Sequence, residues 1–347
     1  MSMNITFGER TETNARSFNA DRCFAGTLQT RDGHELALCC VADGVGSCDQ
    51  GARGADIVIE HLKETLRNGE FQELEQLVPA VEGWCLEANR RILAVAEGSE
   101  GSKAYTTFTG VIHCAGRSLL IHVGDSRAYW LTEGSSRCLT ADHTHANYAL
   151  ASGVSAQHIQ PDDWRTLARC FDGRKDASVD LRLDVIPANE EGWILVTSDG
   201  VHDRVGEEGM LTVASYAPSA AELAGRLVGA AVRNGSRDNA TAAVMRLGDI
   251  PQTEARALPW RDENDTTHGD DATVEAAAGT TRLRRWIALV LVLLLLFGLC
   301  LALIFAWQAG VEEGAGQEQR PRTVPGTGAG ANLGRGLPAE AAGKPGI

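Results

Sequence analysis

The sequence predicts an α+β fold, because its strands come in runs and its helices in pairs. Two adjacent helical segments lie between residues 51 and 95, and two adjoining strands follow between residues 107 and 123. A doubly wound parallel sheet would instead alternate single strands with single helices. The chain has 347 residues, 44% of them hydrophobic, so it can bury a sizeable core.

Hydrophobic spacing defines the individual elements. Residues 51–67, 73–95 and 220–232 repeat apolar side chains at helical intervals, which predicts three amphipathic helices. The two strands at 107–113 and 118–123 flank Cys114-Ala115-Gly116-Arg117, which is typical of a hairpin turn.

Two apolar runs far apart in the chain, at 38–42 and 194–198, both end on Asp-Gly. Each run reads as a buried strand, and the glycine lets the backbone turn or approach a ligand closely. Two further carboxylates also stand at strand ends. A cluster of hard oxygen ligands for a divalent metal is therefore predicted. The four residues are Asp43, Asp125, Asp199 and Asp238.

The charge and the cysteines exclude some classes of function. The formal net charge of -14 gives an acidic surface that disfavours nucleic-acid binding. The nine cysteines contain no C-x-x-C pair, which fits a reducing compartment. Cys39 and Cys40 are adjacent within an apolar run, so we expect them to pack in the core.

Composition divides the chain into four parts. Residues 1–248 form a globular domain, and 249–285 are an acidic disordered linker with a basic end. Residues 286–307 carry no charge and are long enough for a transmembrane helix, with a tryptophan at each end. Residues 308–347 are a disordered tail rich in Gly, Pro and Ala. Arginines just before the span predict a single-pass inner-membrane protein with a cytoplasmic N-terminal domain.

Short motifs follow one another in a distinctive order along the domain. A single Asp-Gly pair indicates little, because turns use it everywhere. Over roughly residues 5–247, however, the series resembles the metal-dependent Ser/Thr phosphatases of type 2C, the PPM family, in their bacterial form. The motifs are Arg16-Ser17-Phe18-Asn19-Ala20-Asp21, Asp43-Gly44-Val45-Gly46-Ser47, Gly124-Asp125-Ser126-Arg127-Ala128-Tyr129, Leu139-Thr140-Ala141-Asp142-His143-Thr144, Ser198-Asp199-Gly200-Val201 and Arg237-Asp238-Asn239-Ala240-Thr241.

The resemblance implies a four-layer αββα sandwich, in which helix pairs flank a central antiparallel β-sandwich. It also implies two Mn²⁺ or Mg²⁺ ions in a cleft at one edge of that sandwich. By resemblance, Asp43 bridges both ions and the Gly44 carbonyl holds one of them, while Asp199 and Asp238 complete the other site.

Three further roles come from the same resemblance. Asp21 supports the cluster from behind or through water, and Asp125 with Asp199 can bind a third ion. Arg16 stands where the family places its phosphate-binding arginine, and a guanidinium can clamp a phosphoryl group with two hydrogen bonds.

The implied chemistry agrees with these residue types. Mg²⁺ and Mn²⁺ favour octahedral oxygen coordination and keep several waters, so few direct protein ligands are expected. A water shared by two metals loses its proton near neutral pH and becomes a hydroxide aimed at phosphorus. The implied substrates are phosphoserine and phosphothreonine of cytoplasmic proteins, and the implied partner is a cognate Ser/Thr kinase.

Two positions depart from the family pattern. Ala20 stands where the family usually has Glu or Gln, and alanine cannot ligate a metal, so weaker affinity for one ion is expected. Val45 stands where some members carry a histidine as general acid. Protonation of the leaving group would then fall to water or to another residue.

Several polar residues also have structural interpretations. Asp125 could be a turn carboxylate partnered by Arg127, and Asp142 is expected to cap the helix that follows it. His143 is expected to be structural, and Trp164 to be a packing residue in the polar segment 147–172. This segment corresponds to the variable flap beside the family's cleft. His113 and His122 lack ligand spacing.

Two alternative functions stay open on the sequence. Ala20 motivates a membrane-anchored pseudophosphatase that binds phosphoproteins or scaffolds a kinase. The retained aspartates make this alternative weaker. The same fold could also act on a small phosphorylated metabolite, although a membrane anchor suits a membrane-localised protein substrate better.

Overall fold

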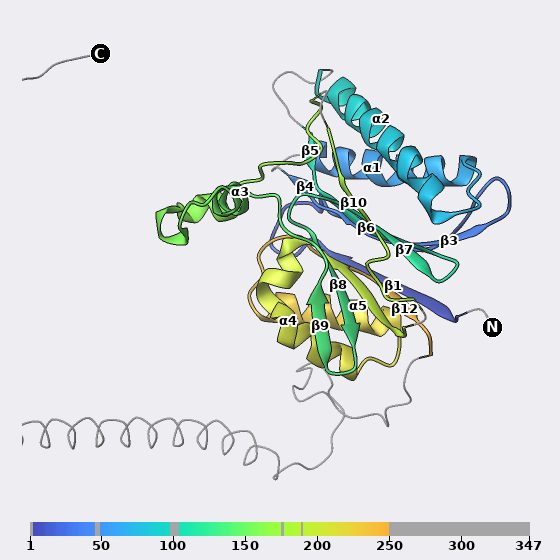
Figure 1. The fold of residues 1–347 in the computed structure, drawn as a ribbon. Helices are drawn as coiled ribbons and strands as arrows, with labels where there is room; N and C mark the ends of the chain where they lie inside the picture. The colour runs from blue at the N-terminus through green and yellow to red at the C-terminus, as the bar shows by residue number, and fades with distance from the viewer. Residues whose placement is uncertain (1–2, 46–48, 98–103, 175–176, 189, 250–347) are drawn as a thin grey trace, which may run out of the picture. The chain divides into compact units, whose positions relative to one another are not determined.

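Two five-stranded antiparallel sheets lie face to face at the centre of the domain (Figure 1). This is a computed structural model, and it describes residues 3–45, 49–97, 104–174, 177–188 and 190–249. The α+β prediction is confirmed, because the helices lie in separate layers outside the sheets rather than between parallel strands.

The first sheet unites the two ends of the domain. Its order is β1-β12-β11-β8-β9, and every neighbouring pair is antiparallel. The N-terminal strand pairs directly with the last strand, with Ile5 opposite Leu247. The strands are β1 (Ile5–Glu12), β8 (Arg127–Thr132), β9 (Ser135–Cys138), β11 (Gly192–Thr197) and β12 (Ala240–Leu247).

The second sheet has the order β10-β7-β6-β3-β2 and is also antiparallel throughout. The predicted hairpin is confirmed, because β6 and β7 pair across Ala115 and Gly116. Both turn residues have positive φ, 49° and 80°, as a tight two-residue hairpin requires. The strands are β2 (Arg22–Gln29), β3 (Glu35–Ala42), β6 (Phe108–Cys114), β7 (Arg117–Val123) and β10 (Asp180–Leu183). A small ladder joins β4 (Gly44–Val45) to β5 (Tyr105–Thr106).

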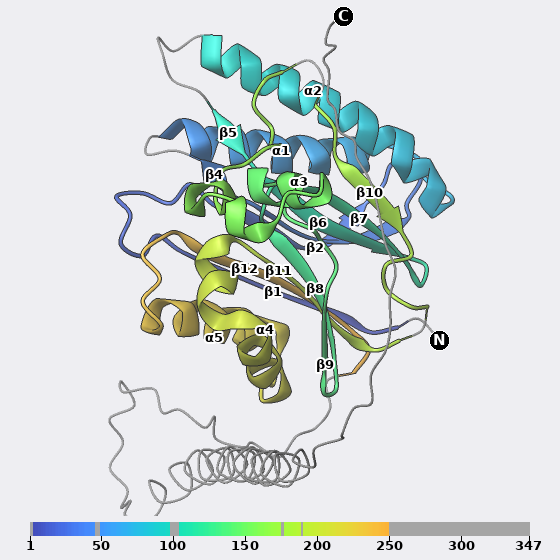
Figure 2. The same cartoon turned by 60° about the vertical axis from the view of Figure 1, so that its left-hand side comes forward.

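A pair of helices covers the outer face of each sheet. Figure 2 shows α1 and α2 above the second sheet and α4 and α5 below the first. The polar segment after β9 forms α3 (His145–Ala151) and two short 3-10 turns, Ala156–His158 and Pro161–Trp164. The paired helices are α1 (Asp49–Asn68), α2 (Leu77–Glu97, after a 3-10 turn at Leu74–Gln76), α4 (Asp199–Ser215) and α5 (Ala220–Arg233).

Side-chain alternation along the strands creates three apolar layers. Along β3, Cys40 packs toward α1 and α2, whereas Cys39 packs between the two sheets. Along β11, Leu195 packs toward α4 and α5, whereas Ile194 and Val196 face the other sheet. Both faces of these strands are buried, which explains their continuous apolar runs and confirms the core packing of the two adjacent cysteines.

The helix that follows Asp199 has no counterpart in the sequence analysis. Its stretch is rich in glycine and charge, and the helix is interrupted at Gly206, where φ is 66° and ψ is 166°. A kinked helix lacks the regular apolar stripe on which helix prediction depends. By contrast, the predicted 51–67, 73–95 and 220–232 segments correspond to α1, α2 and α5.

The chain divides into two compact units, Met1–Glu263 and Asn264–Ile347. Among the residues that the structure describes, no helix combines the length and the apolar character needed to cross a bilayer. The predicted span at 286–307, most of the linker at 249–285 and the tail at 308–347 lie outside the described residues.

Candidate metal centre

Four aspartates from strand ends of both sheets line one cavity. Asp43 follows β3 and Asp125 follows β7, both in the second sheet. Asp199 follows β11 and Asp238 precedes β12, both in the first sheet. The cavity has a volume of about 690 Å³. Gly44 and Arg16 line it as well, so the structure brings together every predicted site residue except Asp21.

Asp21 lies beneath the cavity and is only 1% exposed. The hydroxyl of Ser198 donates a 2.8 Å hydrogen bond to its carboxylate, and the same hydroxyl accepts one from the Thr241 amide. This position suits the supporting role expected of Asp21. Its neighbour Ala20 is buried too, and its amide donates a 2.8 Å hydrogen bond to the Asn239 side chain.

Asn239 holds the loop that carries Arg16, a role that the sequence analysis missed. Its side-chain amide donates to the carbonyls of Thr13 and Phe18, at 2.9 Å and 3.1 Å. Together with the bond from Ala20, these contacts tie the loop on both sides of Arg16 to the residue after Asp238. This role of Asn239 is evident only from its burial and its three backbone contacts. No pattern in a single sequence reveals such contacts.

The two glycines of the Asp-Gly pairs allow backbones to touch. A Cβ on Gly44 would lie 2.5 Å from the backbone of Gly51 in α1, and one on Gly200 would lie 1.9 Å from the Asn239 carbonyl oxygen. Neither glycine has a positive φ, so the requirement is for space rather than for an unusual conformation. Close contact therefore fixes Asp43 against α1 and Asp199 against the Asp238 loop.

Burial and mutual repulsion disfavour the charged forms of Asp43, Asp125 and Asp199. Burial, followed by the charges of Asp21 and Asp199, raises the pKa of Asp43 well above its usual range. Burial, followed by Asp125 and Asp238, raises the pKa of Asp199 to about 7. Burial also raises the pKa of Asp125 to about 6. A cluster of buried like charges is stabilised by a cation held among them.

The chemistry of this donor set fits Mn²⁺ or Mg²⁺. Both ions prefer carboxylate and carbonyl oxygens. In the described part of the chain, no group of three or more His, Cys, Asp or Glu residues is arranged to hold one ion by direct contacts. Ions that keep several waters need few direct contacts, so part of the coordination would pass through water.

The electrostatics predict how stability without metal depends on pH. The folded-state pKa of Asp199 is raised from 3.8 to about 7. Its contribution to the free energy of unfolding is therefore fully present below about pH 4 and is lost as the pH rises through 7. Replacing Asp199 by Asn removes this loss, so in EDTA we expect Asp199→Asn to be the more stable protein. The difference grows with pH to about 4 kcal/mol at pH 8.

Chemical denaturation of both full-length proteins in EDTA between pH 4 and pH 8 measures this difference. Comparing the wild type with the variant cancels the titration of the buried histidines, because it affects the stability of both proteins equally. Saturating Mn²⁺ should stabilise the wild type more than the variant, because the metal binds the deprotonated carboxylates. A constant difference across this pH range would contradict the prediction.

Arg16 lines the cavity and forms an ion pair with Asp238, with 2.5 Å between Nη2 and Oδ2. The predicted phosphate-binding residue therefore contacts a predicted metal ligand. Its side chain is 51% exposed, so the guanidinium can reach a ligand in the cavity. The site thus places an exposed arginine beside carboxylates that suit a divalent cation.

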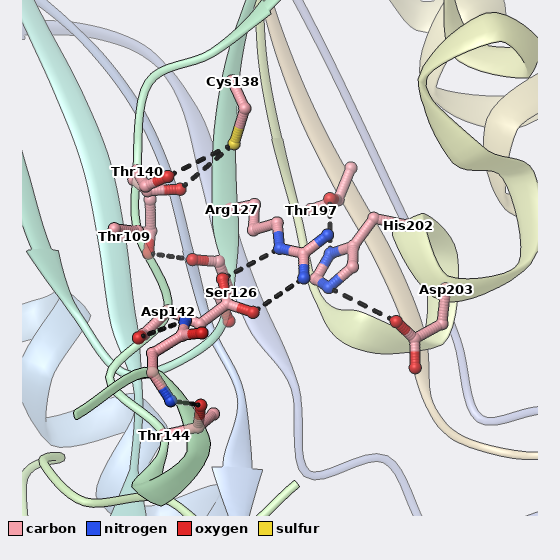
Figure 3. Close-up of polar contacts among 12 residues, drawn as sticks. Thr109, Ser126, Arg127, Cys138, Thr140, Asp142, Thr144, Thr197, His202 and Asp203 are labelled. Atoms are coloured by element: carbon pink, nitrogen blue, oxygen red, sulfur yellow. Dashed lines mark hydrogen bonds and ion pairs between the residues drawn. The ribbon is translucent and has the colours of Figure 1, made fainter. Parts of the chain in front are cut away.

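Arg127, two residues after Asp125, forms a bidentate ion pair with Asp142 (Figure 3). The two hydrogen bonds measure 2.8 Å and 2.7 Å. Two structural interpretations from the sequence are therefore wrong. Arg127 does not partner Asp125, and Asp142 does not cap α3, because Thr144 is the N-cap. The fork of Arg127 offers Asp142 two charge-assisted bonds, which are stronger than one cap hydrogen bond.

His202 in α4 lies within range of the Arg127 charge, and both side chains are drawn in Figure 3. Burial, followed by the charge of Arg127, lowers the pKa of His202 to about 3, so this histidine is neutral. On the other side, the hydroxyl of Thr109 donates a 2.8 Å hydrogen bond to the Ser126 carbonyl. These contacts fix the turn that presents Asp125.

Two further histidines, His143 and His122, bond the strands and turns around Asp125, which is the structural role expected for His143. The Gly124 amide donates a 3.1 Å hydrogen bond to Nδ1 of His143, and Nε2 of His143 lies 3.1 Å from a carboxylate oxygen of Asp180. His122 bonds Thr109 and the Ala141 carbonyl. Burial lowers the pKa of both histidines. None of these rings lines the cavity.

The polar segment 147–172 borders the cavity, as the flap prediction requires. Arg165, Thr166 and Leu167 line it from this segment. The packing role expected for Trp164 is wrong, because the residue is 45% exposed. Arg165 and Arg174, neither of which the sequence singled out, bring two further positive charges to the cavity wall.

Comparison with known proteins identifies the domain. A family model described as protein phosphatase 2C matches residues 11–239. The chain belongs to the protein phosphatase 2C family. This match includes the cavity aspartates, Arg16 and Asn239, so the phosphatase 2C domain contains the whole metal centre.

Relatives of this phosphatase 2C domain come from several bacteria. Serine/threonine protein phosphatase PstP of Mycobacterium tuberculosis is 30% identical over 249 residues, which cover 70% of this chain and 45% of PstP. The chain thus spans about half the length of that relative. Serine/threonine phosphatase stp of Listeria welshimeri is 26% identical over 237 residues, or 66% of this chain and 90% of the relative.

Solved structures share the fold of the phosphatase 2C domain. The catalytic domain of PstP in complex with 2 manganese ions matches with a TM-score of 0.58 and 27% identity, over 72% of this chain and 100% of that structure. The S. agalactiae serine/threonine phosphatase matches with a TM-score of 0.63 at 22% identity, over 70% of this chain and 99% of that structure. Manganese in PstP agrees with the donor set described above.

Proposed function

We propose that this protein is a metal-dependent phosphatase that hydrolyses phosphoserine and phosphothreonine in proteins. The observation that carries the proposal is a single cavity lined by four aspartates and Arg16. This arrangement joins a divalent-cation site to an anion-binding guanidinium, a combination that suits metal-dependent hydrolysis of a phosphate monoester. The serine/threonine phosphatase relatives support the same substrate class.

The residues of the cavity would hold two ions. We assign Asp43 to both metal ions and the Gly44 carbonyl to one of them, with Asp199 and Asp238 completing the other site. Asp21 supports Asp43 from below, and Asp125 with Asp199 could take a third ion. When bound, the ions lower the pKa of a shared water and offset negative charge on the phosphoryl oxygens.

Arg16 would bind and orient the phosphoryl group. In the structure its guanidinium contacts Asp238, so it exchanges this partner for the substrate phosphate. A planar guanidinium can hold two phosphoryl oxygens at once. Asn239 keeps the Arg16 loop in place through its three backbone contacts, so less backbone freedom of this loop is lost on binding.

The leaving-group oxygen would receive its proton from water. Val45 lines the cavity at the position where some family members place a histidine. The valine side chain has no acidic proton to donate, and none of the domain's described histidines lines the cavity. The cavity is open to solvent and polar, which leaves room for such a water.

The wider setting of the enzyme rests on sequence alone. We propose that residues 286–307 anchor the protein in the inner membrane, with the phosphatase domain in the cytoplasm. Its substrates would then be phosphorylated cytoplasmic proteins, and a Ser/Thr kinase would supply them. The acidic surface of the chain argues against nucleic acid as a partner.

A metal-dependence assay tests the proposed activity. The full chain, freed of metal with EDTA, should not hydrolyse a phosphothreonine peptide, and added Mn²⁺ or Mg²⁺ should restore turnover. Phosphate release measures the rate, and titration calorimetry measures metal binding. Turnover that persists in EDTA would reject the proposed mechanism. Phosphopeptide binding without metal binding or turnover would instead favour a phosphoprotein-binding scaffold.

A further inference from the structure

A second cavity of about 430 Å³ adjoins the metal centre. The two cavities share four lining residues, so they meet along one wall. Arg16 and Asp238 form part of that wall and are paired with each other. The shared residues are Arg16, Arg165, Asp199 and Asp238.

Arginines from four separate segments line the second cavity. Arg16 belongs to the loop after β1, and Arg165 follows the 3-10 turn of the flap. Arg204 lies in the first part of α4, and Arg237 lies in the loop before β12. A fold that brings four arginines from distant parts of an acidic chain to one cavity provides a site for an anion.

Three of these guanidinium groups have no partner among the described residues. The side chains of Arg165, Arg204 and Arg237 form no hydrogen bond or ion pair within the part of the chain that the structure covers. Other arginines of the domain do: Arg117 contacts Glu75 and Asp184, for example. Unpaired guanidinium groups keep all their donors available for a ligand.

The charges around the second cavity favour an oxyanion. Arg16 and Asp238 offset each other, which leaves Arg165, Arg204 and Arg237 against Asp199 and Asp203. Asp199 also faces the metal centre, where it would be neutralised by a bound cation. The unpaired arginines therefore dominate, and their planar forks match the geometry of phosphate and carboxylate.

We propose that the second cavity binds a second oxyanion of the substrate peptide, close to the phosphorylated residue that is hydrolysed. Phosphate on a neighbouring Ser or Thr and the carboxylate of a neighbouring Asp or Glu share this chemistry. One to three residues of extended peptide cover about 3 to 10 Å, which suits a cavity that adjoins the first. The proposal rests on the phosphatase function proposed above and names its preferred substrates.

Matched phosphothreonine peptides distinguish the two sources of the oxyanion. Each carries Ala, Glu or a non-hydrolysable phosphonate analogue of phosphothreonine at one of the three positions on either side. With the full chain and saturating Mn²⁺, kcat/KM should rise about tenfold or more when the favoured position carries an oxyanion, mainly through a lower KM. A rise with Glu identifies a carboxylate site, and a rise with phosphonate alone identifies a second-phosphate site.

Variants then locate the effect. Arg204→Gln and Arg237→Gln should each reduce the ratio of kcat/KM between the oxyanion and Ala peptides toward one. Taking a ratio cancels any general loss of activity, and turnover of the Ala peptide shows that the variant is folded. Arg67→Gln, which removes an exposed charge from the last turn of α1, is the matched control and should keep the wild-type ratio.

The outcomes separate this proposal from the proposed function. Equal kcat/KM for all peptides, or an unchanged ratio in both cavity variants, would overturn the second site while leaving the phosphatase activity intact. An equal loss of the ratio in Arg67→Gln would also overturn it, because general charge attraction would then explain the preference. If no peptide is turned over with Mn²⁺, the proposed function fails first.

Discussion

Replacing Asp199 by Asn is expected to lower kcat/KM for a phosphothreonine peptide by about 10³-fold or more, which corresponds to about 4 kcal/mol. The substitution keeps the shape of the side chain but removes a charge from the wall shared by the two cavities. Asp199 interacts electrostatically with Asp125 and Asp238, so its carboxylate is part of the cluster that would hold the ions. Phosphate release with excess Mn²⁺ measures the loss of activity, and calorimetric Mn²⁺ titration measures the loss of metal affinity.

A matched carboxylate outside the site controls this experiment. Asp56 in α1 pairs with Arg22 at the surface, and Asp56→Asn should retain activity within about twofold, because exposed ion pairs contribute little. The stability of Asp199→Asn in EDTA shows that the variant is folded. Full activity in Asp199→Asn would remove this residue from the metal centre, whatever the behaviour of the control.

Replacing Gly200 by Ala is expected to destabilise the domain by about 3 kcal/mol and to abolish most activity. The new Cβ would lie 1.9 Å from the carbonyl oxygen of Asn239, a contact that no side-chain rotation can relieve. Either the start of α4 or the loop before β12 must move. Asp199 and Asp238 stand on those two segments, so their spacing must change.

Gly225→Ala provides the matched control. Gly225 lies within α5, and a Cβ there would meet no atom within 4 Å. Alanine favours helix over glycine by about 1 kcal/mol, so this variant should be slightly more stable than the wild type and fully active. Denaturation curves of the two full-length variants give the comparison. Similar midpoints would show that the close contact at Gly200 is not needed.

Sequence patterns predicted the parts of this molecule that depend on local regularity. The strand before Asp43 is apolar on both faces, and α1 and α5 have clear amphipathic stripes, so their hydrophobic spacing identified them. The four strand-end aspartates were expected to converge, and they line one cavity. The order of the motifs along the chain indicates the phosphatase 2C family, which the family match confirms.

The parts that the sequence did not predict depend on contacts between distant segments. The kink at Gly206 breaks the apolar stripe of α4, so the hydrophobic spacing of the sequence does not predict that helix. Arg127 pairs with Asp142 rather than with Asp125, which is nearer in sequence. The fold brings the side chains of Arg127 and Asp142 together as a bidentate pair. Asn239 acts through three backbone groups of the N-terminal loop, which only tertiary structure brings within reach.

The strand order of the first sheet has a consequence for folding during synthesis. β1 lies at the edge of that sheet and pairs with β12, the last strand that the structure describes. β1 therefore cannot form its hydrogen-bonded pairing with β12 until more than two hundred further residues have been synthesised. Pairing between strands so far apart in the sequence raises the contact order of the domain, and a higher contact order slows folding. Because Asp238 lies just before β12, the candidate metal centre of a nascent chain is incomplete until this last part of the domain has been made.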